Sequence, residues 1–327
     1  MGWAALLVGL TAGTFAAPAP SADPAALSLR GRLQPVAKES GFRMPGYFIW
    51  CASVIRVGDT YHMFAARWPE DTLFPDGYRQ HSEIVRATAT RREGPYQFQE
   101  VVIGKRAPGK WDSAMGHNPA IYSTGNTYVL YYIGSDKGSA YRSIGYASAT
   151  AVTGPWIRND EPLDLGLVSD ANNPAACFEP DGSIKLVWRD ADLKVYLSTA
   201  PSYRGPYRVA NRQVWRDTLE DFFYFKSGGQ YQILCEDDKG RITGHARWGA
   251  HLWSPNGIDG WKEYSPPAAY DHEIRWTDGT VFHPVRRERP WLLLEDGAAT
   301  CLFTAVFDGH QTWNQPVPIR PAYPAAP

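Results

Sequence analysis

The chain has 327 residues, with 33 basic and 34 acidic side chains and a formal net charge of −1. That balance gives no reason to expect nucleic acid or an anionic membrane surface as a partner. Aromatic residues make up 13% of the chain. Trp and Tyr combine a flat apolar face with a polar edge, which suits both packing between strands and stacking on sugar rings.

The chain begins with an apolar run up to Ala17, followed by the Pro/Ala/Ser-rich residues 18–26. This order is typical of a secretory signal peptide that is cleaved in the range Ala16–Ala22, and the run is too short and too interrupted for a membrane anchor. We therefore expect residues 1–22 to be a signal peptide with its Pro/Ala-rich lead, and residues 30–327 to form one domain. The mature protein is expected to be secreted or periplasmic and to have no membrane span.

One short motif recurs along the chain: a small-residue strand, a turn, and then Gly-Pro followed by an aromatic residue. It occurs at Gly94-Pro95-Tyr96, Gly154-Pro155-Trp156 and Gly205-Pro206-Tyr207, and a weaker copy ends at Gly260-Trp261. The copies are roughly 55 residues apart, which is a period typical of repeat architectures.

A second repeat, which occurs five times, consists of two strand-like runs joined by a tight turn of residues that tolerate positive φ. The turns are Gly58-Asp59, Gly125-Asn126, Asp181-Gly182, Gly228-Gly229 and Asp296-Gly297. A hairpin with two further strands in about 55 residues is a propeller blade. We therefore predict an all-β fold, a five-bladed β-propeller. A β-sandwich is the alternative, but it does not explain the fixed period.

The innermost strands of all propeller blades start at the same end of the central funnel, so residues far apart in sequence meet there. Alignment of the five hairpins on their turns predicts which residues these are. The pairs at the funnel mouth are Trp50-Cys51, His117-Asn118, Asn172-Asn173, Glu220-Asp221 and Glu288-Arg289. The second strand of each hairpin returns to the same end and brings Arg67, Asp136, Arg189-Asp190 and Glu236-Asp237.

The blade pattern, the repeated Gly-Pro-aromatic motif and the strand start His117-Asn118-Pro119-Ala120-Ile121 resemble the five-bladed β-propeller glycoside hydrolases. That superfamily contains glycoside hydrolase family 43, with its arabinanases and xylosidases, and relatives that act on fructans and algal oligosaccharides. The resemblance implies an exported O-glycosyl hydrolase for plant or algal oligo- or polysaccharides. In that group, carboxylates of the first three blades act as base, pKa modulator and acid. This chain departs from the pattern, because its first three blades offer Trp50-Cys51, His117-Asn118 and Asn172-Asn173 instead.

The carboxylates of this chain are concentrated in the fourth and fifth predicted blades. Glycoside hydrolysis uses two carboxyl groups, about 6.5–9.5 Å apart for inversion and about 5–5.5 Å for retention. We expect Asp221 or Glu220 to act as a pair with Glu288. Asp170 is a further catalytic candidate. His117 is expected either to act as an acid, to bind a hydroxyl, or to be structural.

Other residues at the mouth are expected to bind the sugar. The insertion at 68–81 is long enough to close one side of the funnel, which favours exo action, and its Trp68 is a candidate platform. Arg289 is expected either to pair with Glu288 or to hold a carboxylate of a uronic or anhydro sugar. The predicted sugar-binding residues are Trp50, Asn118, Asn172, Asn173, Arg189, Arg289, Arg67 and Trp68.

No cofactor is expected, although a structural calcium ion is left open. Calcium on the axis is known in the resembled group, and Asp271-His272-Glu273 and His283 supply ligand atoms near the fifth blade, but no calcium-loop motif is present. The run 236–238, Glu-Asp-Asp, is interpreted as a solvated turn, above all in its later members. The four cysteines are expected to be buried free thiols, since each lies in or beside an apolar run: Cys51, Cys177, Cys235 and Cys301.

Two other functions remain open, because a fold does not fix a function. The missing carboxylates of the first three blades favour a non-catalytic carbohydrate-binding propeller. A polysaccharide lyase that uses His with Tyr or Arg is the second alternative. A lyase releases an unsaturated product that absorbs ultraviolet light, whereas a hydrolase makes only new reducing ends.

Overall fold

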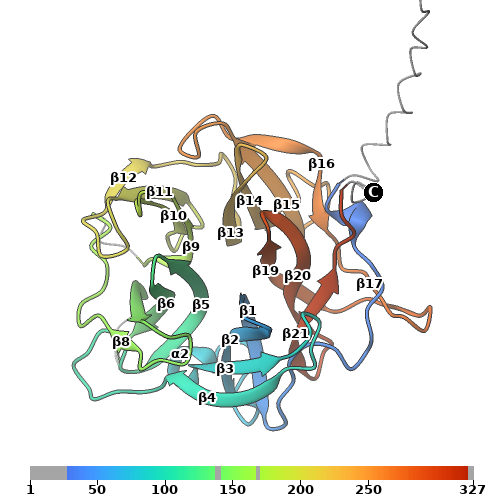
Figure 1. Ribbon diagram of the computed structural model, residues 1–327, viewed down its shortest axis with the longest axis horizontal. Coiled ribbons are helices and arrows are strands. Elements are labelled where there is room, and N and C mark those ends of the chain that lie inside the picture. The colour runs from blue at the N-terminus through green and yellow to red at the C-terminus, as the bar shows by residue number, and fades with distance from the viewer. Residues whose placement is uncertain (1–27, 137–140, 167–169, 323–327) are drawn as a thin grey trace, which may run out of the picture.

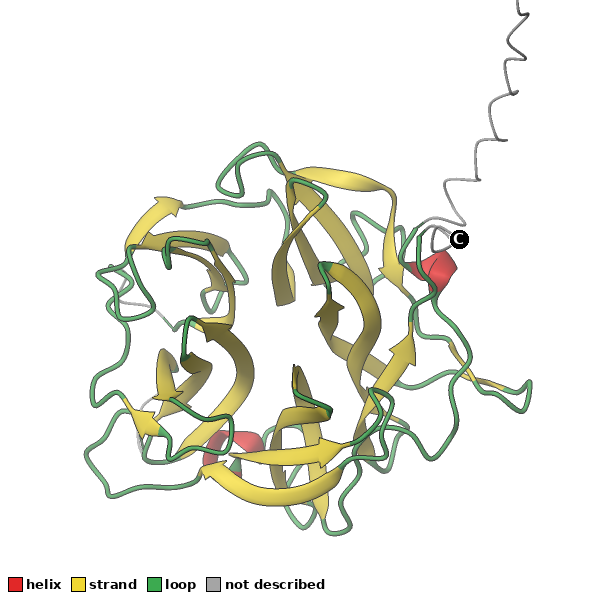
Figure 2. Ribbon diagram, viewed as in Figure 1, coloured by secondary structure: helices red, strands yellow, loops and turns green. Residues whose placement is uncertain are grey.

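The computed structural model describes residues 28–136, 141–166 and 170–322. Five antiparallel sheets are arranged radially around one central axis (Figure 1), and strands make up nearly all of the regular structure (Figure 2). The five-bladed β-propeller predicted from the repeats is confirmed. The expected signal peptide at 1–22 lies outside the described residues.

The first four blades each have four strands, with the first strand of each blade nearest the axis. Blade one contains β1 (Tyr47–Val57), β2 (Thr60–Pro69), β3 (Glu83–Ala89) and β4 (Gln97–Ile103). Blade two contains β5 (Met115–Thr124), β6 (Thr127–Ser135), β7 (Ser143–Ala149) and β8 (Ile157–Arg158). Blade three contains β9 (Asn172–Phe178), β10 (Ile184–Arg189), β11 (Val195–Ala200) and β12 (Arg208–Asn211). Blade four contains β13 (Leu219–Ser227), β14 (Gln230–Asp237), β15 (Trp248–Ser254) and β16 (Lys262–Tyr270).

Blade five has three strands of its own, β19 (Arg286–Glu295), β20 (Ala298–Phe307) and β21 (Thr312–Pro318). The segment that precedes blade one completes its outer edge: Leu33 bridges Ile319, and Phe42 bridges Asn314. The two ends of the domain are thereby joined, and the ring of blades is closed. The remaining elements are the hairpin β17 (Ile274–Arg275) and β18 (Val281–Phe282), the 3-10 helix η1 (Arg30–Arg32) and the short helix α2 (Tyr78–His81).

Aromatic side chains fill the spaces between blades, which accounts for most of the aromatic content. Trp291 of β19 lies at the centre: its ring is 5.5 Å from that of Tyr122 in blade two and 4.8 Å from that of Phe223 in blade four. Its indole N–H also donates to the backbone carbonyl of Val54 in blade one, at 3.0 Å. Trp291 therefore bridges four blades across the axis.

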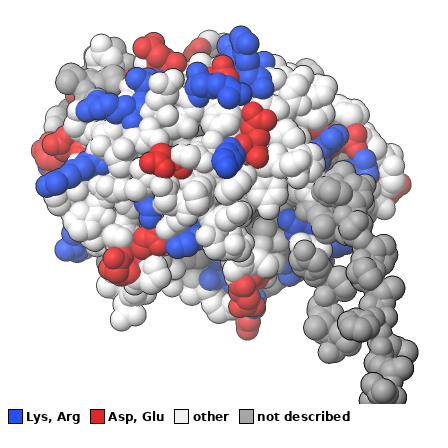
Figure 3. All heavy atoms as spheres, turned by 90° about the horizontal axis from the view of Figure 1, so that it is seen from above, with Lys and Arg blue, Asp and Glu red and all other residues white. Residues whose placement is uncertain are grey.

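The outer surface carries both signs of charge. On the face drawn in Figure 3, Lys and Arg alternate with Asp and Glu without a large patch of one sign. Of the residues that the structure describes, no helix is long and apolar enough to cross a bilayer.

Candidate active site

One unusual backbone conformation recurs at the start of every innermost strand. Cys51, Asn118, Asn173, Asp221 and Arg289 all have positive φ, between 54° and 60°. Each lies at a register irregularity in the pairing of its hairpin, which is characteristic of a β-bulge. Only a few per cent of non-glycine residues have positive φ. Five such residues at equivalent positions confirm the alignment of blades predicted from the turns.

These five residues, which we call the axial ring, contact one another across the funnel. The Cys51 thiol donates to Oδ1 of Asn118 at 3.1 Å, and Nδ2 of Asn173 donates to Oδ1 of Asp221 at 2.6 Å. The guanidinium of Arg289 lies 3.0 Å from the same Asp221 oxygen. Together with Trp291, the ring lines a small pocket of about 30 Å³, which is about the size of one water molecule.

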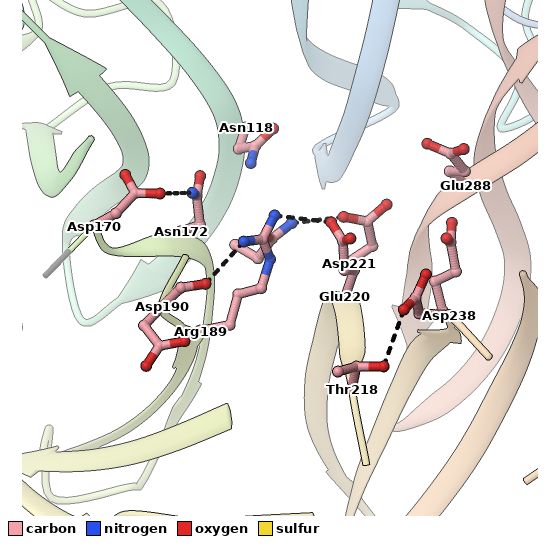
Figure 4. Close-up of polar contacts among 12 residues, drawn as sticks. Asn118, Asp170, Asn172, Arg189, Asp190, Thr218, Glu220, Asp221, Asp238 and Glu288 are labelled. Atoms are coloured by element: carbon pink, nitrogen blue, oxygen red, sulfur yellow. Dashed lines mark hydrogen bonds and ion pairs between the residues drawn. The ribbon is translucent and has the colours of Figure 1, made fainter. Parts of the chain in front are cut away.

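Three buried carboxyl groups converge beside the ring. Asp221 lies at the start of β13, Glu236 at the end of β14 and Glu288 at the start of β19. One oxygen of each lies within 4.8 Å of one oxygen of each of the others. All three side chains belong to residues that are at most 5% exposed. We call this set the carboxyl cluster; Figure 4 shows Glu288 to one side of Asp221 and Arg189 to the other.

Arginines balance the charge of the carboxyl cluster. Arg247 and Arg286 both donate to Oε1 of Glu288, at 2.6 and 2.7 Å. Arg247 also lies 3.2 Å from Oε1 of Glu236. Arg289 pairs with Asp221 through its guanidinium and also donates its backbone N–H to Oδ2, at 3.2 Å. Glu288 and Asp221 therefore have strong donors, whereas Oε2 of Glu236 has no hydrogen-bond partner among the described residues.

The environment shifts the pKa values of two members of the cluster. Burial raises the pKa of the Glu236 carboxyl well above its usual range, and the neighbouring Glu288 and Asp221 add to the increase. Burial also raises the pKa of Asp221, to about 6, although Arg289 opposes the shift. In many acid/base sites, neighbouring carboxyl groups have environments that push their pKa values apart. One group can then stay protonated while another is ionised.

The sequence interpretation missed Glu236. The run 236–238 was expected to be a solvated turn at least in its later members, and Glu236 was not named as a catalytic candidate, but Glu236 is 1% exposed and Asp237 is fully buried. Asp237 accepts hydrogen bonds from the backbone N–H groups of Arg241, Ile242 and Thr243, so it fixes the loop that presents Arg247. The signal was available, since the alignment of hairpins had already placed 236–237 at the funnel mouth.

The structure places the other catalytic candidates in ion pairs or hydrogen bonds. Glu220 pairs with Arg189 at 2.8 Å and is not a member of the carboxyl cluster. Asp170 accepts from the side chain of Arg142 and, at 3.1 Å, from Nδ2 of Asn172. Neither contact brings Asp170 to the cluster.

His117 lies in β5 of blade two and is not a member of the carboxyl cluster. Its Nδ1 is 2.8 Å from the hydroxyl of Ser82, and its ring stacks on Tyr78 with centroids 4.5 Å apart. Burial, together with the nearby Arg289 and Arg142, lowers the pKa of His117 well below its usual value. The imidazole is therefore neutral at neutral pH, which suits a hydroxyl-binding or structural role better than that of an acid.

Two predicted sugar-binding residues do not reach the funnel. Trp68 is 1% exposed and packs between Phe48 and Phe74, so it offers no free face as a platform. Arg67 pairs with Glu83 at 2.7 Å, and its guanidinium lies over the ring of Phe98 on the outermost strand of its blade. The guanidinium also lies 4.3 Å from the ring centre of Tyr47 at the start of β1, so Arg67 is enclosed by residues of its own blade.

The other predicted sugar-binding residues do lie at the mouth or on the ring. Trp50 is 5% exposed, and the guanidinium of Arg286 lies 6.0 Å from its ring centre. Asn118 and Asn173 belong to the axial ring, and each keeps one buried amide atom without a partner among the described residues, Nδ2 in Asn118 and Oδ1 in Asn173. These unpaired amide atoms are the groups best suited to meet a hydroxyl or a water.

The residues do not fit the calcium ion that the resemblance left open. Calcium takes six to eight oxygen ligands. The carboxyl cluster supplies three carboxyl groups, but three arginines already contact them. Asp271 instead pairs with Arg30, and His283 contacts the backbone carbonyl of His272 at 3.2 Å.

The four cysteines are free and buried, as predicted: Cys51, Cys177, Cys235 and Cys301. Burial raises the pKa of the Cys51 thiol to about 12, so the thiol is protonated at neutral pH. A protonated thiol is a weak nucleophile. Cys51 therefore does not replace the missing carboxylate of blade one as a charged group.

No protein-family model matches the sequence, and no curated protein sequence matches it. Solved structures do match the fold. One is a glycoside hydrolase with 13% identity and a TM-score of 0.68, over 90% of this chain and 95% of that one. A family 117 glycoside hydrolase of the marine bacterium Zobellia galactanivorans has 14% identity and a TM-score of 0.60, over 88% of each chain.

The catalytic domain of a family 62 α-L-arabinofuranosidase from Coprinopsis cinerea matches with 13% identity and a TM-score of 0.63, over 88% of this chain and 96% of that domain. At such low identity, the likeness establishes architecture and leaves the reaction to be argued from the site. The chain therefore has the five-bladed propeller fold found in glycoside hydrolases of these families.

Proposed function

We propose that the protein is a glycoside hydrolase that uses Glu236 as general acid and Glu288 as its ionised partner. The observation that carries the proposal is the carboxyl cluster: three buried carboxyl groups within 4.8 Å, of which one has an oxygen without a hydrogen-bond donor. Burying an ionisable group costs free energy, and a function at this position would account for that cost.

Glu236 suits the acid role because burial raises its pKa and keeps its proton on at neutral pH. Glu288 suits the partner role because Arg247 and Arg286 stabilise its charge. The oxygen separation, within 4.8 Å, is nearer to the spacing of about 5–5.5 Å found in retaining enzymes than to that of inverting ones. We therefore propose that Glu288 attacks the anomeric carbon and that the anomeric configuration is retained.

In this scheme Asp221 is a positioning residue. Its Oδ1 accepts from Asn173 and Arg289, and its Oδ2 accepts from the Arg289 backbone. Both oxygens are therefore engaged, which leaves Asp221 less free to exchange a proton with substrate. Its negative charge adds to the effect that raises the pKa of Glu236.

Exo action remains part of the proposal. In the insertion, Phe74 packs on Phe307 of blade five with ring centres 4.4 Å apart, and Tyr78 packs on His117 of blade two. The insertion therefore joins three blades at the mouth, while Trp291 bridges the axis below. This arrangement favours a dead-end pocket over an open cleft. Export is proposed from the apolar amino-terminal run alone.

The test is an activity screen on plant and algal oligosaccharides, with product anomers followed by NMR. The double variant E236Q/E288Q serves as the blank, and the surface variant E263Q is the matched control. We expect monosaccharides with retained configuration from the wild type and from E263Q only. Equal turnover by the double variant would contradict the assignment of residues, and binding without turnover by the wild type would favour the non-catalytic alternative.

The lyase alternative has one observation in its favour, the pair of arginines at the mouth, since lyases must neutralise the carboxylate of a uronic sugar. Elimination leaves a double bond in the product, whereas hydrolysis does not. Ultraviolet absorbance that grows together with product would therefore identify the protein as a lyase and reject the hydrolase proposal.

A further inference from the structure

Two arginines at the funnel mouth share one carboxylate oxygen. Arg247 reaches Oε1 of Glu288 from the loop before β15, and Arg286 reaches it from the first residue of β19. The two guanidinium groups are therefore neighbours. Two cations in such close proximity repel each other unless anions lie between or beside them.

Most of the hydrogen-bonding capacity of these two arginines is unused. Arg247 hydrogen-bonds to a carboxylate through NH2, and Arg286 through Nε. Within the described ranges, Nε and NH1 of Arg247 and both terminal nitrogens of Arg286 have no hydrogen-bond partner. The side chains are 39% and 27% exposed, so the free N–H groups are accessible.

Both side chains are held in place before any ligand arrives. The loop of Arg247 is fixed by the buried carboxylate of Asp237, and the Arg247 backbone carbonyl contacts Nε2 of His272 at 3.1 Å. The guanidinium of Arg286 lies 5.7 Å from the ring centre of Phe74 and 6.0 Å from that of Trp50. A guanidinium held on aromatic rings loses little freedom when it binds an anion.

The charge count at the cluster leaves room for an additional anion. Arg247, Arg286 and Arg289 face three carboxyl groups, Asp221, Glu236 and Glu288. A hydrolase needs one of these groups protonated before the reaction begins. In that state three positive charges face two negative ones, and the mouth has a net charge of +1.

We propose that Arg247 and Arg286 form an anion clamp that binds a carboxylate or sulfate group on the sugar next to the scissile bond, so that the substrate is an acidic glycan. The planar guanidinium fork matches both oxyanions in a bidentate manner. This inference rests on the proposed function for the position of the bond, but the clamp itself is testable by binding alone.

The clamp differs from the role that the sequence suggested for Arg289. That residue pairs with Asp221, donates to it from the backbone as well, and is only 17% exposed in its side chain. Its NH1 and its backbone N–H are therefore engaged by Asp221 inside the axial ring, and its Nε is buried. Arg247 and Arg286, by contrast, are more exposed and meet on Glu288.

The experiment measures sugar binding by calorimetry with the full chain. The probes are methyl glucuronide, a glucose sulfate ester and methyl glucoside, together with the corresponding galactose series. The variants are R247Q and R286Q, with R91Q as control, because Arg91 has an exposed side chain in the turn between β3 and β4 of blade one. Circular dichroism and Tm confirm that each variant is folded, and R286K provides a second test in which the charge is kept but the fork is lost.

We expect a charged sugar to bind roughly tenfold or more tightly than its neutral counterpart, with the preference lost in R247Q and R286Q but kept in R91Q. The ranking of the uronide against the sulfate ester then distinguishes a carboxylate from a sulfate. Equal binding of charged and neutral sugars, no binding of any charged sugar, or a preference that survives both substitutions would overturn the clamp.

The clamp and the proposed reaction fail separately. Hydrolysis of neutral glycans without any preference for charge would refute the clamp and leave the hydrolase standing. Tight binding of acidic sugars that are never cleaved would support the clamp and refute the hydrolase.

Discussion

The two sides of the funnel are built on the same backbone but carry opposite chemistry. Blades one to three present a protonated thiol, a neutral imidazole and the amides of Asn118 and Asn173. Blades four and five present the carboxyl cluster and its arginines. In the proposed reaction, bond breaking is confined to the side of the carboxyl cluster, whereas the thiol, imidazole and amide groups of the other side are suited to binding hydroxyls. Each prediction below tests that division.

The largest effect is expected when the ionised partner is removed from the charged side. E288A should lower kcat by about 10³-fold or more, because the attacking carboxylate is lost. Added azide should restore turnover and give a glycosyl azide, since a small anion fits the vacated space. Steady-state kinetics and product analysis measure both effects. If the substitution left kcat unchanged, the attacking group could not be Glu288 of blade five.

The general acid should show a smaller loss that depends on the leaving group. E236Q is expected to lower kcat by about 10²–10³-fold on natural glycans and by much less on aryl glycosides, whose leaving groups need no proton. In the wild type, activity should fall as the pH rises through the raised pKa of Glu236. A fall in activity that is the same for both substrates would argue against the acid role.

The same substitution should stabilise the fold at alkaline pH. The folded-state pKa of Glu236 is raised above its unfolded value, so ionising it costs stability once the pH exceeds the unfolded pKa, and this cost is absent in more acidic solution. E236Q should therefore have a Tm a few degrees above that of the wild type at pH 8, with the difference shrinking towards pH 4. Calorimetry of E236Q beside E263Q checks this; a difference independent of pH would contradict it.

On the neutral side, an amide deletion should affect binding rather than chemistry. N118A removes a buried donor that has no partner among the described residues. We expect KM to rise by roughly three- to tenfold while kcat changes little. The matched control is N126A, at the exposed turn of the same hairpin. A large fall in kcat with unchanged KM would place chemistry on this side.

The smallest effect is expected at the thiol. C51A should keep activity within about twofold, because the protonated thiol donates a single weak hydrogen bond. Reducing agents should leave both activity and Tm unchanged, since the four cysteines are free. A several hundredfold loss of activity in C51A would identify the thiol as a nucleophile. It would also contradict the assignment of the chemistry to blades four and five alone.

The fold was predictable because turn residues and the Gly-Pro-aromatic motif are local signals that recur with a fixed period. The register was predictable for the same reason, and it placed Asp221 and Glu288 at the mouth. What the sequence could not show is which way each side chain turns. Arg67 and Glu236 both lie at the returning ends of hairpins but one register position apart, since Arg67 pairs with Ile49 and Glu236 with Glu220; Arg67 is enclosed by its own blade, whereas Glu236 joins the carboxyl cluster.

Burial was the second quantity hidden from the sequence. An acidic run such as 236–238 is usually solvated, and here tertiary contacts override that tendency, because Asp237 satisfies the backbone of a whole loop. For Trp68 the error was the reverse. We expected an exposed aromatic side chain, but Phe74 of the insertion packs on Trp68, which is buried.

The axial ring has a consequence for how such proteins change over time. Its five members share a backbone conformation but not a side chain, so each blade provides a socket of the same shape. A point substitution can exchange an amide, a thiol, a guanidinium or a carboxylate in any socket without altering the architecture. Among the five ring positions, a carboxylate stands only in blade four, at Asp221, where the ring and the carboxyl cluster meet.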